Sequence, residues 1–329
     1  MIESRSIHPK AEIHLSDRAV LEEMFIEMCL KADKTHHHAI PVLTGPTATG
    51  KSSLAMSLAT RCGYEIVSAD AMQIYRGFDI GTAKPTIEER TRVPHHMIDI
   101  LDPCESYSVA SYVKKTERIL SQLLSEGKKP LVCGGSVQYV SALLDGLLFT
   151  PKRIDQNLRQ HVNSKIDAIG VQNAWQKLHS LDPESAAIIA PTDRRRIARF
   201  FEMYIETGKT KSELNRLSRR RGPLFSFDAF HLDIEPRTAL YERINKRTEI
   251  MFERGLVEET RELMKKWPNY ETCPAFRGIG YRETIDIVLD KCTEAEALDK
   301  IQKSTRRYAK RQQTWLRKRQ DMTKLVLDF

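Results

Sequence analysis

Short apolar runs alternate with stretches of helical periodicity along the first half of the chain. The predicted elements are strands over 39–44, 65–69 and 130–133, with helices over 51–61 and 108–126. A short apolar run that ends at a glycine turn is typical of a buried strand. Because helices separate these strands, the pattern favours an α/β fold, a parallel sheet with helices on both faces.

The pattern changes after Thr150. Only helical periodicity follows, over 155–169, 171–179 and 193–205, and the basic run at 219–222 is interpreted as a return linker. Strands are predicted again at 229–234 and 326–327, and a long helix begins at the capping box of Thr293 and Glu296 and runs toward Arg319. The predicted parts are an N-terminal appendage over 1–38, a core over 39–150 and 223–329, and an all-helical insertion over 151–222.

The N-terminal appendage contains one amphipathic pattern, over 17–31. Three adjacent histidines follow it and are interpreted as a solvated link. Because every motif described below lies further along the chain, we expect this segment to be dispensable for activity.

Composition narrows the class of protein. With 52 basic and 44 acidic residues the net charge is +8, and 41% of residues are hydrophobic, which excludes a disordered or fibrous chain. No apolar run approaches the roughly 18 residues of a membrane helix, so we expect no membrane partner. The six cysteines form no Cys-x-x-Cys pair and are interpreted as reduced thiols of a cytoplasmic protein. We also expect a monomer.

The positive charge gathers near the C-terminus. Eight basic residues and no acidic one lie between Lys303 and Arg319. Tyr308 and Trp315 are interleaved with them, which suits phosphate contacts combined with base stacking. A solvated helix face is the alternative, and nucleic acid is the partner that this segment favours.

A phosphate-binding loop follows the first core strand. The segment GPTATGKS, from Gly45 to Ser52, fits G-x-x-x-x-G-K-[ST] between a predicted strand and a predicted helix. Its backbone amides suit phosphate oxygens, the Lys51 side chain suits a terminal phosphate, and the Ser52 hydroxyl suits Mg²⁺. The motif predicts a P-loop NTPase-like sheet with a nucleotide such as ATP, or another polyphosphate or diphosphate, as ligand, and leaves the ligand open.

Asp70 is a candidate site residue. It follows the strand at 65–69, and ligands bind at the carboxyl ends of the strands in open α/β sheets. We therefore expect its carboxylate to face the phosphate loop, and its position alone leaves open a structural role or a role as a metal ligand.

Several long motifs occur in a fixed order. They are GPTATGKS, SADAMQIYRGFDIGTAKP, CGGSVQYVSALLDG, DRRRIARFFEM, FRGIGYRE and YAKRQQTWLRK. Together they resemble the tRNA dimethylallyltransferase (tRNA isopentenyltransferase) family of bacterial type, over roughly residues 40–320. The resemblance implies transfer of a dimethylallyl group from dimethylallyl diphosphate to N6 of adenine 37, beside the anticodon of tRNA, with Mg²⁺ as cofactor.

The resemblance also implies site residues. Asp70 would be the general base, Ser136 would lie near the reacting centre, and Arg237 would stabilise the departing diphosphate. The implied donor diphosphate-binding residues are Gly45, Thr47, Ala48, Thr49, Gly50, Lys51 and Ser52. The implied contacts of the tRNA anticodon stem-loop are Asp70, Ala71, Met72, Gln73, Ser136, Arg159, Arg195, Arg196, Arg199, Arg277, Tyr281, Arg282, Lys310, Arg311, Gln312, Thr314, Trp315 and Arg317.

The sequence departs from the family pattern at a few positions. Ala71 stands where the family commonly has serine, and Ser136 where it usually has threonine. Val137-Gln138 replaces a typical glycine and apolar pair, and the N-terminal segment is additional. These departures affect substrate contacts and rate rather than the class of reaction.

Three other functions compete with this reading. A P-loop nucleotide kinase would share the loop and the sheet, and an isopentenyltransferase of free adenine nucleotides would share the loop. A non-catalytic RNA-binding module would leave the loop and Asp70 without a role. The basic, aromatic C-terminal segment and the string after Ser68 favour the tRNA enzyme.

Overall fold

The computed structural model describes residues 11–34, 39–147 and 156–329. The chain divides into two compact units, Met1–Ser141 with Phe225–Phe329 and Ala142–Leu224, called here the sheet unit and the helical unit. The predicted boundary at 150–151 and the histidines at 36–38 lie outside the described residues.

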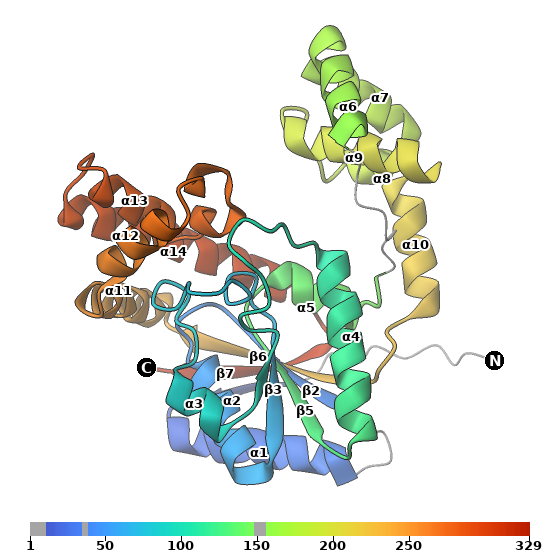
Figure 1. The fold of residues 1–329 in the computed structure, drawn as a ribbon. Coiled ribbons are helices and arrows are strands. Elements are labelled where there is room, and N and C mark those ends of the chain that lie inside the picture. Colours follow the sequence, from blue (N-terminus) through green and yellow to red (C-terminus); the bar gives the residue numbers. More distant parts are fainter. Residues whose placement is uncertain (1–10, 35–38, 148–155) are drawn as a thin grey trace. The chain divides into compact units, whose positions relative to one another are not determined.

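The sheet unit is built on seven parallel strands in the order β1-β7-β6-β2-β5-β3-β4 (Figure 1). The strands are β1 (Glu12–Leu15), β2 (Ile40–Thr44), β3 (Tyr64–Ser68), β4 (His95–His96), β5 (Lys129–Cys133), β6 (Phe227–Glu235) and β7 (Met322–Asp328). The predicted α/β class with a parallel sheet is confirmed. The predicted strands at 229–234 and 326–327 were too short, because both belong to a β6–β7 ladder that continues to Glu235 and Asp328.

Helices cover both faces of this sheet (Figure 1). Those of the sheet unit are α1 (Arg18–Lys34), α2 (Lys51–Cys62), α3 (Ile87–Arg92), α4 (Val109–Ser125), α5 (Val137–Leu144, which continues into the helical unit), α11 (Arg237–Glu253), α12 (Leu256–Lys266), η1 (Tyr270–Thr272), η2 (Pro274–Arg277), α13 (Tyr281–Val288) and α14 (Glu294–Leu316). Phe230, Leu232 and Ile234 of β6 pack in one cluster with α1 and α2. Successive side chains of a strand point to opposite faces, so His231 and Asp233 face the other side.

The N-terminal segment is part of the core, and its description as an appendage was wrong for the described residues. β1 pairs with β7, with Leu15 opposite Leu327. On α1, Phe25 is fully buried and its ring meets Phe230 edge to face at 5.2 Å. The helical period was visible in the sequence, but the strand at 12–15 was too short and too polar to detect.

Two further expectations need correction. Residues 219–221 belong to α10 (Lys211–Arg221) and are not a linker, because the capping box of Thr210 and Glu213 begins a helix that ends only at Gly222.

Cys104 and Cys273 form a disulfide, whereas six reduced thiols were expected. The fold brings these two residues together across 169 positions, which no spacing rule could show.

The helical unit has its own core. Its helices are α6 (Gln156–Ile169), α7 (Val171–Leu181), α8 (Pro183–Ala186), α9 (Arg194–Thr207) and α10. Ala174, Leu178, Ile197 and Phe200 are among the side chains buried in one cluster. No helix in the described part of the chain has the length and apolar character needed to cross a bilayer.

Candidate active site

The phosphate loop occupies the turn from β2 into α2. Gly45 passes so close to β6 that a Cβ there would overlap the Leu232 carbonyl oxygen, and Gly50 caps α2 with a φ of 96°. Thr49 is buried, and its hydroxyl donates to the Pro46 carbonyl at 3.0 Å. The loop is therefore preformed and lies at the start of a helix, where an anion is favoured.

Lys51 lies folded against this loop. Its Nζ donates to the Pro46 carbonyl oxygen at 2.5 Å and lies 3.5 Å from the Thr49 hydroxyl. Burial lowers the pKa of Lys51 to about 8, and the charges of Arg247, Asp70 and Asp233 act on it as well. The ammonium is poorly solvated here, so a bound anion would be a strong partner for it.

Asp70 lies at the carboxyl end of β3, as the sequence predicted. Its Oδ1 accepts hydrogen bonds from the amides of Met72 at 2.8 Å and Gln73 at 3.3 Å. Within the described residues Oδ2 has no hydrogen bond. One oxygen therefore fixes the carboxylate, and the other remains able to accept a proton.

Ser136 ties the loop after β5 to the loop after β3. Its hydroxyl accepts a hydrogen bond from the Ala71 amide at 2.8 Å, and its own amide donates to the Ala69 carbonyl at 3.0 Å. Ala71 stands where the family commonly has serine, and it keeps this contact because the donor is its backbone amide. Ser136 thus holds the segment that carries Asp70, whatever contact its hydroxyl makes with a ligand.

Helix α11 supplies arginines that sequence reasoning missed. Arg243 Nε donates to the Ala48 carbonyl oxygen of the phosphate loop at 3.0 Å. Arg247 is among the charges that shift the pKa of Lys51, and Asp70 in turn acts on Arg247, whose pKa is lowered by burial. Arg237 is exposed at the first turn of the helix and is not among the charges that act most on Lys51. The spacing of four residues between Arg243 and Arg247 places them on one helix face, a signal that was present in the sequence.

Helix α14 also contacts the phosphate loop. Gln312, which is 1% exposed, accepts a hydrogen bond from the Thr47 amide at 3.0 Å and donates to the Gly135 carbonyl at 2.7 Å. The next residue, Gln313, donates to Asp233 at 2.9 Å. Gln312, expected among the tRNA contacts, therefore faces the phosphate loop.

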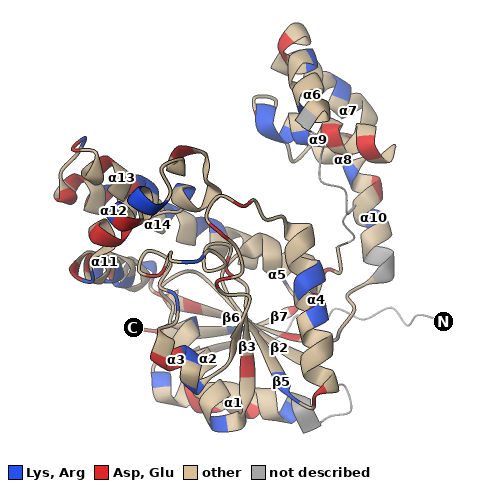
Figure 2. Cartoon of the chain, viewed as in Figure 1, with Lys and Arg blue, Asp and Glu red and all other residues tan. Residues whose placement is uncertain are grey.

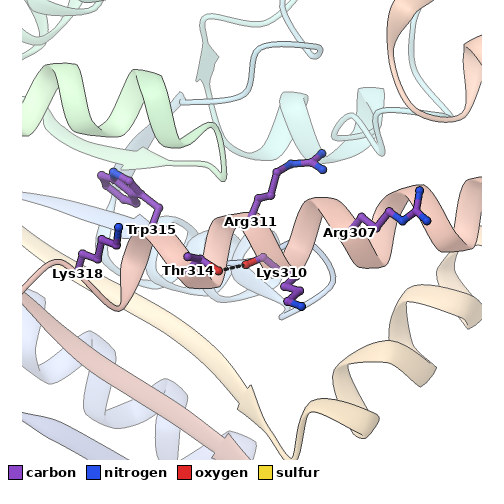
Figure 3. Close-up of a pocket in the computed structure, with 6 residues that line it drawn as sticks. All are labelled: Arg307, Lys310, Arg311, Thr314, Trp315 and Lys318. Atoms are coloured by element: carbon purple, nitrogen blue, oxygen red, sulfur yellow. Dashed lines mark hydrogen bonds between the residues drawn. The ribbon is translucent and has the colours of Figure 1, made fainter. Parts of the chain in front are cut away.

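The outer side of α14 is basic. A surface pocket of about 450 Å³ is lined by Arg307, Lys310, Arg311, Thr314, Trp315 and Lys318 (Figure 3). No acidic side chain lines this described pocket, and Arg317 is exposed beside it. The guanidinium of Arg311 lies 5.7 Å from the Tyr308 ring centre. Cations and an accessible indole on one helix face are the combination that single-stranded nucleic acid requires.

The 277–282 stretch divides between surface and core. Arg277 and Arg282 are exposed, and Arg282 contacts Glu283 at 2.6 Å. Tyr281 is fully buried, its hydroxyl donates to Glu259 at 2.5 Å, and its ring packs on Phe78. Tyr281 is therefore a core residue here, and its hydroxyl also accepts a hydrogen bond from the Gly81 amide of the segment that follows Asp70, at 3.1 Å.

Met72 and Gln73 lie in that turn. Gln73 accepts a hydrogen bond from the Ser68 hydroxyl at 3.1 Å, and Met72 packs so closely on Gly278 that a Cβ there would lie 2.5 Å from its Cε. The buried Lys84 holds the same segment through Asp79 at 2.6 Å and Asp99 at 2.7 Å. Most of the motif at residues 68–85 therefore holds Asp70 in place.

The helical unit carries both basic and acidic residues along its helices (Figure 2). Arg159 and Arg199 share Glu202, at 3.4 Å and 3.2 Å, although they lie on α6 and α9. Arg196 pairs with Asp193 at 3.4 Å, and Arg195 is exposed with no ion pair among the described residues. Of the basic residues that the sequence assigned to this unit, the fold thus brings Arg159 and Arg199 together at Glu202.

Comparisons with known proteins show the family to which the chain belongs. The family model described as IPP transferase matches residues 73–319. The tRNA dimethylallyltransferase of Halothermothrix orenii is 39% identical over 281 residues, which is 85% of each chain, and that of Caldanaerobacter subterraneus is 40% identical over 280 residues, 84% of this chain and 88% of the relative.

Solved structures are similar over the same span. The tRNA isopentenylpyrophosphate transferase of Bacillus halodurans matches with a TM-score of 0.64 and 35% identity, over 88% of this chain and 90% of the other. A eukaryotic dimethylallyltransferase described as acting on tRNA matches with a TM-score of 0.73 and 26% identity, over 88% of this chain and 73% of the other.

Proposed function

This chain belongs to the IPP transferase family, and on that premise we propose that it transfers a dimethylallyl group from dimethylallyl diphosphate to N6 of adenine 37 in tRNA. The observation that carries the proposal is the position of Asp70. It lies at the same sheet edge as a preformed phosphate loop, with one carboxylate oxygen fixed and the other free.

The chemistry requires a base and an anion site side by side. The adenine amine is a poor nucleophile, so removing its proton while the N–C bond forms lowers the barrier. In the proposed step the free Oδ2 of Asp70 accepts that proton. The C–O bond of the donor breaks at the same time, and both bonding electrons leave with the diphosphate.

The loop would stabilise the departing diphosphate. Its amides, the Lys51 ammonium and the Arg247 guanidinium provide positive charge where negative charge grows. Arg247 is favoured over Arg237 for this role, because its charge acts on Lys51 and Asp70 acts on it, whereas Arg237 is exposed.

The residues present also fit a Mg²⁺ ion. The Ser52 hydroxyl lies on the first turn of α2 and has no hydrogen bond within the described residues. Mg²⁺ typically takes few protein ligands and completes its shell with phosphate oxygens and water. When bound, the ion would neutralise diphosphate charge, and Ser52 is the residue that would hold it.

We propose that the basic side of α14 and the arginines of the helical unit bind the anticodon stem-loop. An adenine in a single-stranded loop leaves its stack at a lower cost than one in a duplex. The chain is further proposed to act as a cytoplasmic monomer, which sedimentation can test.

One incubation tests the reaction. The protein is mixed with unmodified tRNA, dimethylallyl diphosphate and Mg²⁺, and nucleosides are analysed by mass spectrometry. A single prenyl group on adenosine is expected. Parallel reactions with free adenine nucleotides and with γ-labelled ATP test the adenylate isopentenyltransferase and the kinase. Transfer in either of these, without modification of tRNA, would overturn the proposal.

A further inference from the structure

Arg18, the first residue of α1, reaches the phosphate loop. An added Cβ at Gly50 would lie 3.2 Å from both Nη1 and Nη2 of Arg18, and 3.4 Å from its Cζ. The two terminal nitrogens of the guanidinium are therefore directed at the residue that precedes Lys51. Neither the family resemblance nor the motifs assign any role to this side chain.

No acidic group balances Arg18. It is exposed, and within the described residues it has neither an ion pair nor a hydrogen bond. Its charged neighbour is Arg243, whose pKa is lowered by burial and by the positive charge of Arg18. Arg243 is held against the loop through Ala48. Two guanidinium groups that converge on one loop without a carboxylate repel each other, and an anion between them would relieve this repulsion.

The helix that carries Arg18 is fixed to the loop's own helix. Glu22 of α1 accepts a hydrogen bond from the Ser57 hydroxyl of α2, and Glu23 pairs with Arg61 of α2. Leu21 and Phe25 are buried in the core against the sheet. The Arg18 backbone is therefore held in place, and only its side chain has to order when a ligand binds.

We propose that Arg18, together with Arg243, binds the terminal phosphate of the diphosphate donor, so that the N-terminal segment completes the donor site. This inference rests on the proposed function, because it assigns a contact to the same donor. A guanidinium can donate two parallel hydrogen bonds to phosphate oxygens, and both Nη atoms already point toward the loop. The ligand class is a diphosphate monoester or inorganic diphosphate.

The test uses inorganic diphosphate and dimethylallyl diphosphate as probes, with Mg²⁺, in calorimetric titrations of the full chain. Arg18→Gln should weaken the binding of both by roughly tenfold, the usual scale of one charge-assisted contact. Arg18→Lys should recover part of the loss. The control is Lys31→Gln, an exposed cation of the same helix that pairs with Glu27, and it should bind like wild type.

The outcomes separate the two proposals. If wild type neither binds diphosphate nor modifies tRNA, the proposed function itself fails. If wild type does both and Arg18→Gln binds diphosphate as tightly, the role of Arg18 is overturned. A loss of tRNA affinity with unchanged diphosphate affinity would overturn it as well, by assigning Arg18 to RNA. Thermal unfolding should be unchanged, since the side chain is exposed. If Arg18→Gln does unfold, a partial loss of affinity in Arg18→Lys and a tenfold loss in Arg18→Met provide the same comparison.

Discussion

The Gln312 side chain joins the Thr47 amide of the phosphate loop to the Gly135 carbonyl of the loop after β5, at 3.0 Å and 2.7 Å. Gln312 belongs to α14, whose opposite side carries the basic pocket. One helix therefore contacts the proposed donor site with one face and presents cations to the proposed RNA with the other.

Replacing Gln312 by alanine should damage donor handling more than tRNA binding. The change leaves the Thr47 amide without its partner and the Gly135 carbonyl with only the 3.5 Å hydrogen bond from the Tyr308 hydroxyl, and a buried unpaired group costs about 1–3 kcal/mol. We expect a higher KM for dimethylallyl diphosphate, a lower Tm and nearly normal tRNA affinity. Asp299→Ala, at an exposed position on the same helix outside the basic pocket, is the control. Weaker tRNA binding with an unchanged KM for the donor would instead place Gln312 among the RNA contacts.

Asp70→Asn should retain the fold and lose turnover. The amide oxygen can still accept the hydrogen bonds of Met72 and Gln73, so the turn remains, but the side chain cannot take a proton. Loss of a general base typically reduces kcat by ~10²–10⁴-fold. Single-turnover rates and tRNA affinity are measured together, with Asp70→Ala as the variant that loses the turn as well. A rate near that of wild type in Asp70→Asn would exclude Asp70 as the base.

Donor affinity should fall as the pH rises through about 8. Burial depresses the pKa of Lys51 to about 8, so its ammonium is charged below that pH and becomes neutral above it. Binding of a diphosphate then requires uptake of a proton, and affinity can fall by up to ~tenfold per pH unit. Lys51→Ala should bind weakly with a flatter profile, and Lys51→Arg should stay charged throughout. The donor's own ionisation affects all three proteins equally, so each variant's affinity is divided by that of wild type at the same pH. Equal pH profiles for all three proteins would contradict the assignment of Lys51 as the titrating group.

The N-terminal segment should be required for stability. Phe25 is fully buried against Phe230, and removing a buried phenylalanine costs about 3–5 kcal/mol. Phe25→Ala should therefore lower the free energy of unfolding by about that amount, whereas Val20→Ala, at a half-exposed position on the same helix, should change it by about 0.5 kcal/mol or less. Denaturant titration gives both values. A deletion of residues 1–34 that unfolds like the full chain would restore the description of this segment as an appendage.

The sequence predicted what depends on local patterns. Apolar runs located β2, β3 and β5, and the glycine spacing located the loop around Lys51, because both signals lie within a few residues. It missed β1, whose place beside β7 depends on a partner more than 300 residues away. The inward direction of Gln312 and Tyr281 was also missed, since a run of tRNA-contact residues on a helix does not show which face packs on the core. Arg243 and Arg247 became apparent only when α11 was placed against the loop.

Charge reversal on the outer face of α14 should act on RNA binding rather than on chemistry. Lys310 and Arg311 line the basic pocket and are exposed, so Lys310→Glu with Arg311→Glu should weaken tRNA binding and leave donor affinity nearly unchanged. Each lost phosphate contact should reduce the slope of log affinity against log salt by roughly 0.7–0.9.

The matched control is Lys265→Glu with Lys266→Glu on α12. It changes the net charge by the same amount at exposed positions outside the pocket. If only the net charge of the protein mattered, both double variants would lose the same tRNA affinity, because the net charge does not depend on which basic residues carry it. Direct phosphate contacts instead predict a shallower salt slope for the α14 variant alone. Titrations at several salt concentrations distinguish these cases, and equal slopes for both variants would leave the basic face of α14 without a specific role in RNA binding.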